Sequence, residues 1–171
     1  PNNSEFIYCL LALLKINAII SPVSPELTPF ELKGIFHNLN PHAIITPSAS
    51  IEKVINEYPD IFEDKILISQ GDVVSKGRAK RHYKLRELYK ETSYRINNPE
   101  TPPEQTATIN YTYRGMGSPL GAMLTHSNYA EGVLAYVENT RMAPTHRIMS
   151  LLPPFHVYPL VGCTFAPLLC G

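Results

Sequence analysis

The segment Asn110–His126 of this 171-residue chain reads NYTYRGMGSPLGAMLTH. Its first residues continue an apolar run from Ala107 and predict a β-strand, and the glycines that follow at 115, 117 and 121 predict a tight loop. Glycine has no Cβ, so the backbone can turn sharply there or approach a ligand closely. Successive N–H groups in such a loop form a concave site for phosphate oxygens. The segment therefore predicts a nucleotide-phosphate site, while the same glycine spacing is also found in ordinary turns.

The residues before this loop alternate between helical and extended patterns. Apolar periodicity predicts helices at 5–15, 28–38 and 51–58, and short apolar runs predict strands at 18–21, 43–46, 65–69 and 107–111. Thr28-Pro29-Phe30-Glu31 reads as a capping box with proline at the first helical position. The alternation predicts an α/β fold in which βαβ units form a parallel sheet. Ligands bind at the carboxyl ends of such strands, which is where the glycine loop begins.

The residues after the loop predict a second set of elements. These are an apolar strand at 122–124, a helix at 127–139 capped by Thr125 or Ser127, a strand at 147–151 and an apolar helix at 161–170. Residues 97–105 are rich in proline and predict a loop that leads into the strand before the glycines. Residues 76–90 hold many of the basic residues, and their partly amphipathic pattern favours a solvated helix face over a nucleic-acid or lipid-headgroup patch.

Composition excludes several classes of protein. Fifteen basic and fifteen acidic residues give a net charge of zero, which argues against a nucleic-acid partner or an anionic membrane surface. No apolar run is long enough to span a bilayer. The three cysteines lie in apolar surroundings without a CxxC pair, which favours reduced thiols and a cytoplasmic protein over a redox or metal role. No His, Cys and carboxylate cluster has metal-site spacing, so no protein-ligated metal is expected.

Four collinear segments resemble the AMP-forming, or adenylate-forming, synthetases, which include acyl-CoA ligases, coumarate-CoA ligases, luciferases and peptide-synthetase adenylation domains. Residues 111–128 follow the pattern Tyr-Thr-x-x-x-x-Gly-x-Pro-x-Gly-x-Met-Leu-Thr-His-x-Asn, which is similar to the phosphate loop of that family. Residues 6–20, 21–46 and 151–171 are similar to family segments in the same order. LTHSN and PPFHVYPLVG favour the acyl-CoA and coumarate-CoA ligase branch. The chain is therefore expected to form, over 1–171, a single partial N-terminal AMP-binding domain.

The resemblance implies a two-step ligase reaction. A carboxylate attacks the α-phosphorus of ATP, giving an acyl-adenylate and pyrophosphate, and a thiol, usually that of coenzyme A, then attacks the acyl carbon. ATP, Mg²⁺ and coenzyme A are implied as cosubstrates and cofactor, and a fatty or aromatic small-molecule carboxylic acid as the substrate. Donors from a glycine-rich loop, together with Mg²⁺, offset the charge that develops on the departing pyrophosphate. An acyl-CoA synthetase of fatty acid metabolism is one such enzyme.

The resemblance also assigns residues to these roles. The implied ATP phosphate-binding residues are Thr112, Tyr113, Arg114, Gly115, Met116 and Gly117. In Pro153-Pro154-Phe155-His156-Val157-Tyr158, His156 is implied to orient the carboxylate as the catalytic residue, and His156 and Tyr158 to line the acyl pocket. The residues alone, without the resemblance, instead favour a core histidine and tyrosine at the end of a strand.

The loop departs from the family pattern at several positions. Tyr113 replaces a small residue, Gly115 and Met116 replace hydroxyl residues, and Leu120 stands where the family has a lysine. Arg114 can bind phosphate bidentately, or it is an exposed residue of a degenerate loop.

Other family elements are absent from the chain. The Tyr-Gly-x-Thr-Glu and Thr-Gly-Asp segments and the C-terminal lysine are missing, so residues 1–171 alone are expected to be inactive. Two alternatives to the ligase remain. One is a degenerate relative that acts as a non-catalytic binding or regulatory module. The other, a dinucleotide-binding unit, is disfavoured because the glycines do not fit Gly-x-Gly-x-x-Gly.

Overall fold

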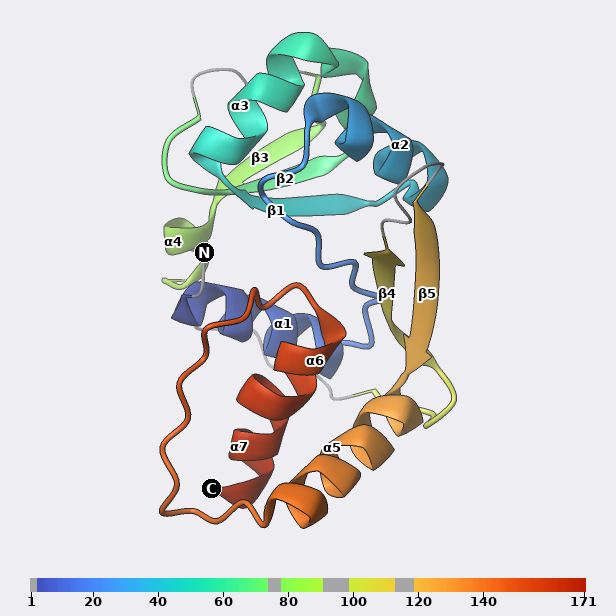
Figure 1. The fold of residues 1–171 in the computed structure, drawn as a ribbon. Coiled ribbons are helices and arrows are strands. Elements are labelled where there is room, and N and C mark those ends of the chain that lie inside the picture. Colours follow the sequence, from blue (N-terminus) through green and yellow to red (C-terminus); the bar gives the residue numbers. More distant parts are fainter. Residues whose placement is uncertain (1–2, 74–77, 91–98, 113–118) are drawn as a thin grey trace. The chain divides into compact units, whose positions relative to one another are not determined.

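The structure, a computed structural model, describes residues 3–73, 78–90, 99–112 and 119–171 (Figure 1). Contacts divide the chain into two compact units. Unit 1 comprises residues 1–24 and 96–171, and unit 2 comprises residues 25–95. Unit 1 is therefore discontinuous in sequence, and unit 2 is a single stretch inserted into it.

Unit 2 contains a three-stranded parallel sheet. The strands β1 (Ala43–Pro47), β2 (Ile66–Gln70) and β3 (Arg81–Lys84) lie in that order, with β2 in the centre. Helix α3 (Ser48–Glu57) and the 3₁₀ turn η1 (Pro59–Phe62) connect β1 to β2, which makes a βαβ unit. This sheet confirms the predicted α/β fold. Two parallel strands need a crossover connection of this length, because a tight turn cannot return the chain to the same end of the sheet.

Two helices pack against this sheet, and both lie on the same side of it in Figure 1. Helix α2 (Pro29–Leu39) begins with the predicted capping box, in which the Thr28 hydroxyl accepts from the Glu31 N–H and the Glu31 carboxylate accepts from the Thr28 N–H. Asn40 ends the helix in the left-handed conformation. The core of unit 2 is fully buried and includes Ile35, Val54, Ile55, Phe62 and Leu67.

The segment 76–90 is not the helix that its amphipathic pattern predicts. Among its described residues, 81–84 form β3 and only Leu85–Leu88 form a helix, α4. Backbone pairing with β2 holds β3 in the sheet, so most of the side chains of β3 can be polar. The buried residue Leu85 follows directly after the strand. Charged side chains on an outer strand are common, because they discourage pairing with a foreign strand. The helix prediction is wrong because the periodicity of residues 76–90 carries no information about their pairing with β2.

Unit 1 is built around a β-hairpin and several helices. Strands β4 (Thr106–Thr112) and β5 (Leu120–Thr125) are antiparallel, with a register irregularity between Thr106 and Thr108. Helix α5 (His126–Thr140) follows β5 directly. Of the two predicted caps, Thr125 is the one that caps it, because its hydroxyl accepts from the Asn128 N–H. Helix α1 (Ser4–Lys15) begins at Asn3, whose side chain accepts from the Phe6 N–H.

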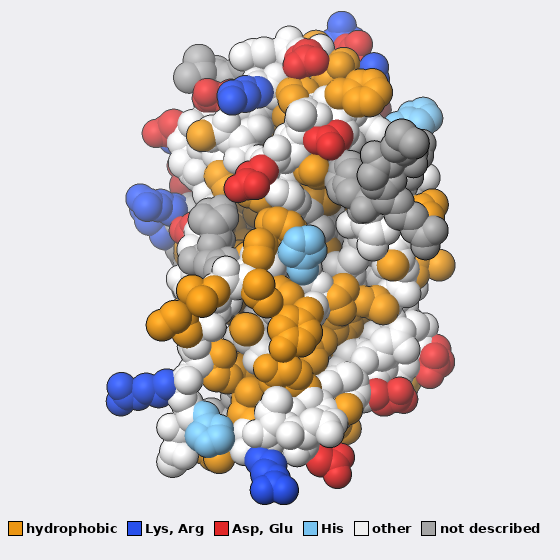
Figure 2. Space-filling model, in the orientation of Figure 1, with side chains coloured by type: hydrophobic (Ala, Val, Ile, Leu, Met, Phe, Trp, Pro, Cys, Tyr) orange, Lys and Arg blue, Asp and Glu red, His pale blue; other side chains and the backbone are white. Residues whose placement is uncertain are grey.

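The end of the chain is helical, as predicted, but is not a regular α-helix. A short helix α6 (Val157–Pro159), a π-helical segment η2 (Leu160–Phe165) and helix α7 (Ala166–Cys170) follow one another without a break. Leu160 packs with Leu10, Ala107 and Tyr129 in the core of unit 1. Tyr129 also meets the ring of Phe165 edge to face, with centroids 5.4 Å apart. Figure 2 shows apolar side chains gathered over the part of unit 1 that holds α1, α6 and α7.

Two strand predictions in unit 1 need correction. Residues 18–21 contribute a single parallel bridge, Ile20 to Thr108, rather than a strand. Residues 147–151 form no strand, and Met149 and Leu151 are each 78% exposed. Backbone N–H and C=O groups need partners, and among the described residues no strand pairs with 147–151. Within the same described part of the chain, no helix has the length and hydropathy needed to cross a bilayer.

Candidate functional site

The candidate phosphate site begins where β4 ends, at the end of the β4–β5 hairpin that leads into the glycine loop. Thr112 is the last residue of β4 and pairs with Leu120, the first residue of β5. The Thr112 hydroxyl is exposed and donates to the Leu120 carbonyl at 3.5 Å, a long contact that leaves the hydroxyl available to a ligand. Leu120 is 55% exposed and carries no charge at this position. Of the six predicted phosphate-binding residues, only Thr112 is described; Tyr113, Arg114, Gly115, Met116 and Gly117 lie outside the described residues.

The third glycine of the motif has a packing role within the hairpin. A Cβ on Gly121 would lie 2.8 Å from Cγ2 of Ile109 and 3.4 Å from the ring of Tyr111. Both side chains belong to β4, which faces Gly121 across the hairpin. Glycine is therefore needed at 121 because side chains of β4 lie against the backbone of β5. The atoms that come close to Gly121 belong to the protein and not to a ligand.

A buried polar cluster anchors the strand that ends at Thr112. The hydroxyls of Thr108 and Tyr129 are 2.8 Å apart, and the Asn110 amide nitrogen donates to Thr108 Oγ1 at 2.6 Å. All three residues are buried. Strand β4 is also held by Ser21, whose hydroxyl donates to the Ile109 carbonyl at 2.8 Å. In the sequence, Tyr129 fits the apolar face of a helix, and nothing local indicates its polar partners. The signal for this cluster is the spacing of Thr108 and Asn110, which places both side chains on one face of β4.

His156 lies at the start of the last helical segment. Its backbone is extended, its N–H donates to the Pro153 carbonyl at 3.2 Å, and its carbonyl accepts from the Leu160 N–H at 3.3 Å. Its side chain is exposed, with the ring 4.6 Å from that of Phe155. The Pro153-Pro154 pair thus ends an irregular stretch, and His156 occupies the residue where the helix begins. The imidazole lies outside the apolar core.

Tyr158 contacts helix α5 rather than the hairpin. Its ring meets that of Tyr136 at 73°, with centroids 6.0 Å apart, and Tyr158 itself is 59% exposed. The pKa of Tyr136 is raised above its ordinary value, mainly by a hydrogen bond with Tyr158. Burial and the charge interactions with Tyr158 and Cys163 raise it further. No hydrogen bond or ring contact between described residues joins Thr112 to His156 or Tyr158. His156 contacts Phe155, Tyr158 contacts Tyr136, and Thr112 lies at the end of β4.

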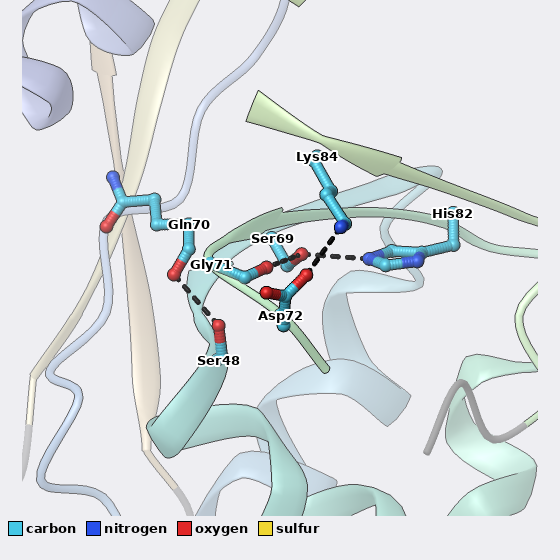
Figure 3. Close-up of polar contacts among 7 residues, drawn as sticks. All are labelled: Ser48, Ser69, Gln70, Gly71, Asp72, His82 and Lys84. Carbon is cyan, nitrogen blue, oxygen red and sulfur yellow. Dashed lines mark hydrogen bonds and ion pairs between the residues drawn. The ribbon is translucent and has the colours of Figure 1, made fainter. Parts of the chain in front are cut away.

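Unit 2 has its own polar cluster at the carboxyl ends of its parallel strands (Figure 3). The buried Ser69 hydroxyl donates to the Gly71 carbonyl at 2.8 Å and lies 2.8 Å from Nε2 of His82. Lys84 forms an ion pair with Asp72, and the hydrogen bond and charge of Lys84 lower the pKa of the Asp72 carboxyl.

The start of α3 belongs to the same cluster. The Ser48 hydroxyl donates to the Gln70 carbonyl at 2.8 Å, and Gly71 has a φ of +108°. A Cβ on Gly71 would lie 2.7 Å from Ser48 Oγ. These residues carry no motif in the sequence, and their contacts fix the turn after β2. In the part of the chain that the structure describes, no group of three or more His, Cys, Asp or Glu side chains has the arrangement of a metal site.

Comparison with known proteins identifies the family. The profile of the AMP-binding enzyme family matches residues 1–171. The chain belongs to the AMP-binding enzyme family. This finding confirms the resemblance to the adenylate-forming synthetases, which rested on the glycine loop and three collinear segments.

Curated relatives of this AMP-binding chain include plant 4-coumarate–CoA ligases. The chain is 26% identical over 175 residues to 4-coumarate–CoA ligase 2 of Nicotiana tabacum, covering 100% of the chain and 30% of that protein. It is 28% identical over 174 residues to 4-coumarate–CoA ligase CCL1 of Humulus lupulus, covering 99% of the chain and 30% of that protein. The chain thus spans about 30% of the length of the curated relatives it matches.

Solved structures share the fold of this AMP-binding chain. An anthranilate CoA ligase in complex with anthranoyl-AMP superposes with a TM-score of 0.87 at 16% identity, over 99% of this chain and 32% of the ligase. The ATP-bound MatB of Rhodopseudomonas palustris superposes with a TM-score of 0.82 at 20% identity, over 99% of this chain and 32% of MatB. These likenesses confirm the fold.

Proposed function

We propose that the protein containing this chain is an ATP-dependent acid–thiol ligase. It activates a small fatty or aromatic carboxylic acid as an acyl-adenylate and transfers the acyl group to coenzyme A. The family match and the relatives named as 4-coumarate–CoA ligases support this proposal. We further propose that residues 1–171 form one partial AMP-binding domain, with the proline-rich loop at 97–105 before β4, and that the protein is cytoplasmic.

The exposed Thr112 hydroxyl at the end of β4 is the observation that carries the proposal. β4 is fixed on both sides, by the buried contacts of Thr108 and by the Ser21 bond to Ile109, so the hydroxyl has a defined position. A defined donor at the mouth of a loop can stabilise a phosphate oxygen without reorganising. In this proposal Thr112 begins the ATP phosphate site, and Tyr113, Arg114, Gly115, Met116 and Gly117 complete it.

The cation of the phosphate site is assigned to Arg114. Leu120 can neither donate a hydrogen bond nor carry charge, although its side chain is exposed beside Thr112. A guanidinium remains charged at all physiological pH values and can hold two phosphate oxygens at once. Mg²⁺ supplies further charge neutralisation when bound with ATP. Its protein ligands are not assigned to this chain.

His156 and Tyr158 are assigned to the carboxylic acid. His156 is exposed at a helix start, where its ring can donate a hydrogen bond to the acid's carboxylate and orient it toward the α-phosphorus. The carboxylate oxygen then forms a bond to phosphorus, and the bond from phosphorus to pyrophosphate breaks. Tyr158, two residues further along the chain, presents an exposed ring and borders the acyl group.

Pyrophosphate exchange tests the proposal. The protein is expressed from its complete reading frame and incubated with ATP, labelled pyrophosphate and a panel of aliphatic and aromatic acids. Acid-dependent formation of labelled ATP is the expected result, followed by acyl-CoA formation when coenzyme A is added. No exchange with any acid would overturn the ligase. Residues 1–171 alone are expected to give none, and turnover by that piece would contradict the proposed dependence on the rest of the protein.

A second candidate function is a non-catalytic binding or regulatory module. The observation that favours it is Leu120, an exposed apolar residue where the resemblance has a lysine. ATP titration of the complete protein separates the two functions. Saturable ATP binding that Arg114→Ala weakens supports the ligase, whereas no ATP binding supports the module.

A further inference from the structure

Tyr136 of α5 holds the side chain of Tyr158 in one orientation. The rings meet edge to face, and their hydroxyl groups share a hydrogen bond. Edge-to-face pairs of this kind add stability beyond the area they bury. Tyr158 is 59% exposed, so few other contacts restrain its ring. The orientation of Tyr158 therefore depends on Tyr136.

Gly162 provides the space that Tyr136 occupies. A Cβ on Gly162 would lie 2.8 Å from Cζ, 3.0 Å from Cε2 and 3.0 Å from the hydroxyl of Tyr136. Gly162 is buried in the π-helical segment η2, which packs along α5. Its φ is not in the left-handed region, so conformation does not require glycine there. The requirement is steric, and the three atoms nearest to such a Cβ all belong to the Tyr136 side chain.

We propose that Tyr136 is a positioning residue that sets acid specificity by fixing the ring of Tyr158. This inference rests on the proposed function, in which Tyr158 borders the acyl group. An immobile ring selects its ligand by shape, and a flat aromatic acid can stack on it or meet it edge to face. A mobile ring adapts to acids of different shape and orders only on binding, which weakens the binding of each. The structure thus assigns to the pair a preference for aromatic over flexible aliphatic acids.

The central test compares KM and kcat across the acid panel in the complete protein. Tyr136→Phe keeps the ring and removes the hydroxyl that bonds to Tyr158. Loss of one hydrogen bond predicts a KM for the preferred aromatic acid that rises by about three- to tenfold, with kcat nearly unchanged. The KM values for aliphatic acids should change less, so the difference in KM between aromatic and aliphatic acids becomes smaller. Tyr8→Phe removes an exposed hydroxyl from α1 and serves as the matched control, with an unchanged profile.

Gly162→Ala tests the same geometry from the other side. Its methyl group displaces the Tyr136 ring without removing either tyrosine, and it should narrow discrimination as Tyr136→Phe does. A structural readout is independent of turnover. In spectra of protein labelled at tyrosine Cζ, the signal lost in Tyr136→Phe identifies Tyr136, and Tyr158→Phe should lower the pKa of that tyrosine toward its ordinary value.

The outcomes separate this inference from the proposed function. If the wild-type protein activates no acid, the ligase fails and the specificity role fails with it. If the wild type is active and Tyr136→Phe leaves every KM ratio unchanged, the role of Tyr136 alone is overturned. The same holds if Tyr158→Phe leaves the titration of Tyr136 where it was. A lower aromatic preference in Tyr136→Phe, with Tyr8→Phe unaffected, supports the inference.

Discussion

The Tyr129 hydroxyl lies 2.8 Å from Oγ1 of Thr108, and this contact joins helix α5 to the strand that carries Thr112. Asn110 donates to the same Thr108 oxygen from the same strand. Because all three side chains are buried, each depends on the others for hydrogen bonding. The position of Thr112 is thereby coupled to a polar contact inside unit 1.

Tyr129→Phe should destabilise unit 1 without changing its shape. The variant keeps the ring contact with Phe165 but leaves Thr108 with one partner fewer, so the free energy of unfolding should fall by about 1–3 kcal/mol. Urea denaturation measures the difference. Tyr8→Phe, at an exposed position, should change it by less than about 0.5 kcal/mol. Equal effects of the two variants would show that the buried hydrogen bond contributes nothing.

Gly121→Ala should be destabilising because of one identified clash. The new methyl group would approach Cγ2 of Ile109 to 2.8 Å, which predicts a loss of about 1–3 kcal/mol. Ile109→Ala removes that carbon. In a double-mutant cycle, the pair should therefore cost less than the sum of the two single changes. Simple additivity would mean that Gly121 is required for another reason.

Thr28→Ala should weaken helix α2. The hydroxyl that accepts from the Glu31 N–H is lost, and removal of such a cap costs about 1 kcal/mol. Thermal or urea unfolding measures the change. Thr28→Ser keeps the oxygen and is the matched control. An alanine variant as stable as the serine variant would show that the cap is dispensable.

The pH dependence of stability should report on Glu31. Hydrogen bonds from the backbone N–H and then the hydroxyl of Thr28 lower the pKa of Glu31 from its ordinary value of 4.5. A carboxyl whose pKa is lowered on folding stabilises the folded state above its unfolded pKa and loses that contribution as the pH falls through the folded pKa. The stability advantage of the wild type over Glu31→Gln should therefore be constant above pH 4.5 and shrink below it. An advantage that persists unchanged in acid would contradict the cap.

Thr112→Ala and Leu120→Lys should change ATP affinity in opposite directions. Loss of the exposed hydroxyl predicts weaker ATP binding by about two- to tenfold, from one hydrogen bond. A lysine at 120 adds a cation beside Thr112 and should strengthen binding, more so at low ionic strength. Calorimetric titration of the complete protein measures both. If neither variant changes the affinity, phosphate does not bind at this end of the hairpin.

Local signals in the sequence predicted local structure well. Thr28 and Thr125 cap helices α2 and α5 as expected, because a cap involves residues three positions apart. The parallel sheet of β1 and β2 followed from short apolar runs separated by a helix. Such features depend on neighbouring residues, and a single sequence contains all the information they require.

Pairing between distant residues limited the rest. The helix predicted over β3 is wrong because its pairing partner, β2, lies outside the local pattern. The strand predicted at 147–151 is wrong because apolar character alone does not supply a pairing partner. At the candidate site, the family resemblance implies Thr112, His156 and Tyr158, but the contact of Tyr136 with Tyr158 joins residues on separate helices. Only the folded structure shows that contact.

The division of the chain has a consequence for the order in which it folds during synthesis. Unit 2 is one continuous stretch, so all of its contacts can form once residue 95 has left the ribosome. Unit 1 must wait, because Ile20 bonds to Ala107 and Ile109, which are made much later. Helix α1 therefore remains without its core partners, Ala107, Tyr129 and Leu160, while unit 2 is already complete. The residues of α1 are therefore made before unit 2 and buried after it.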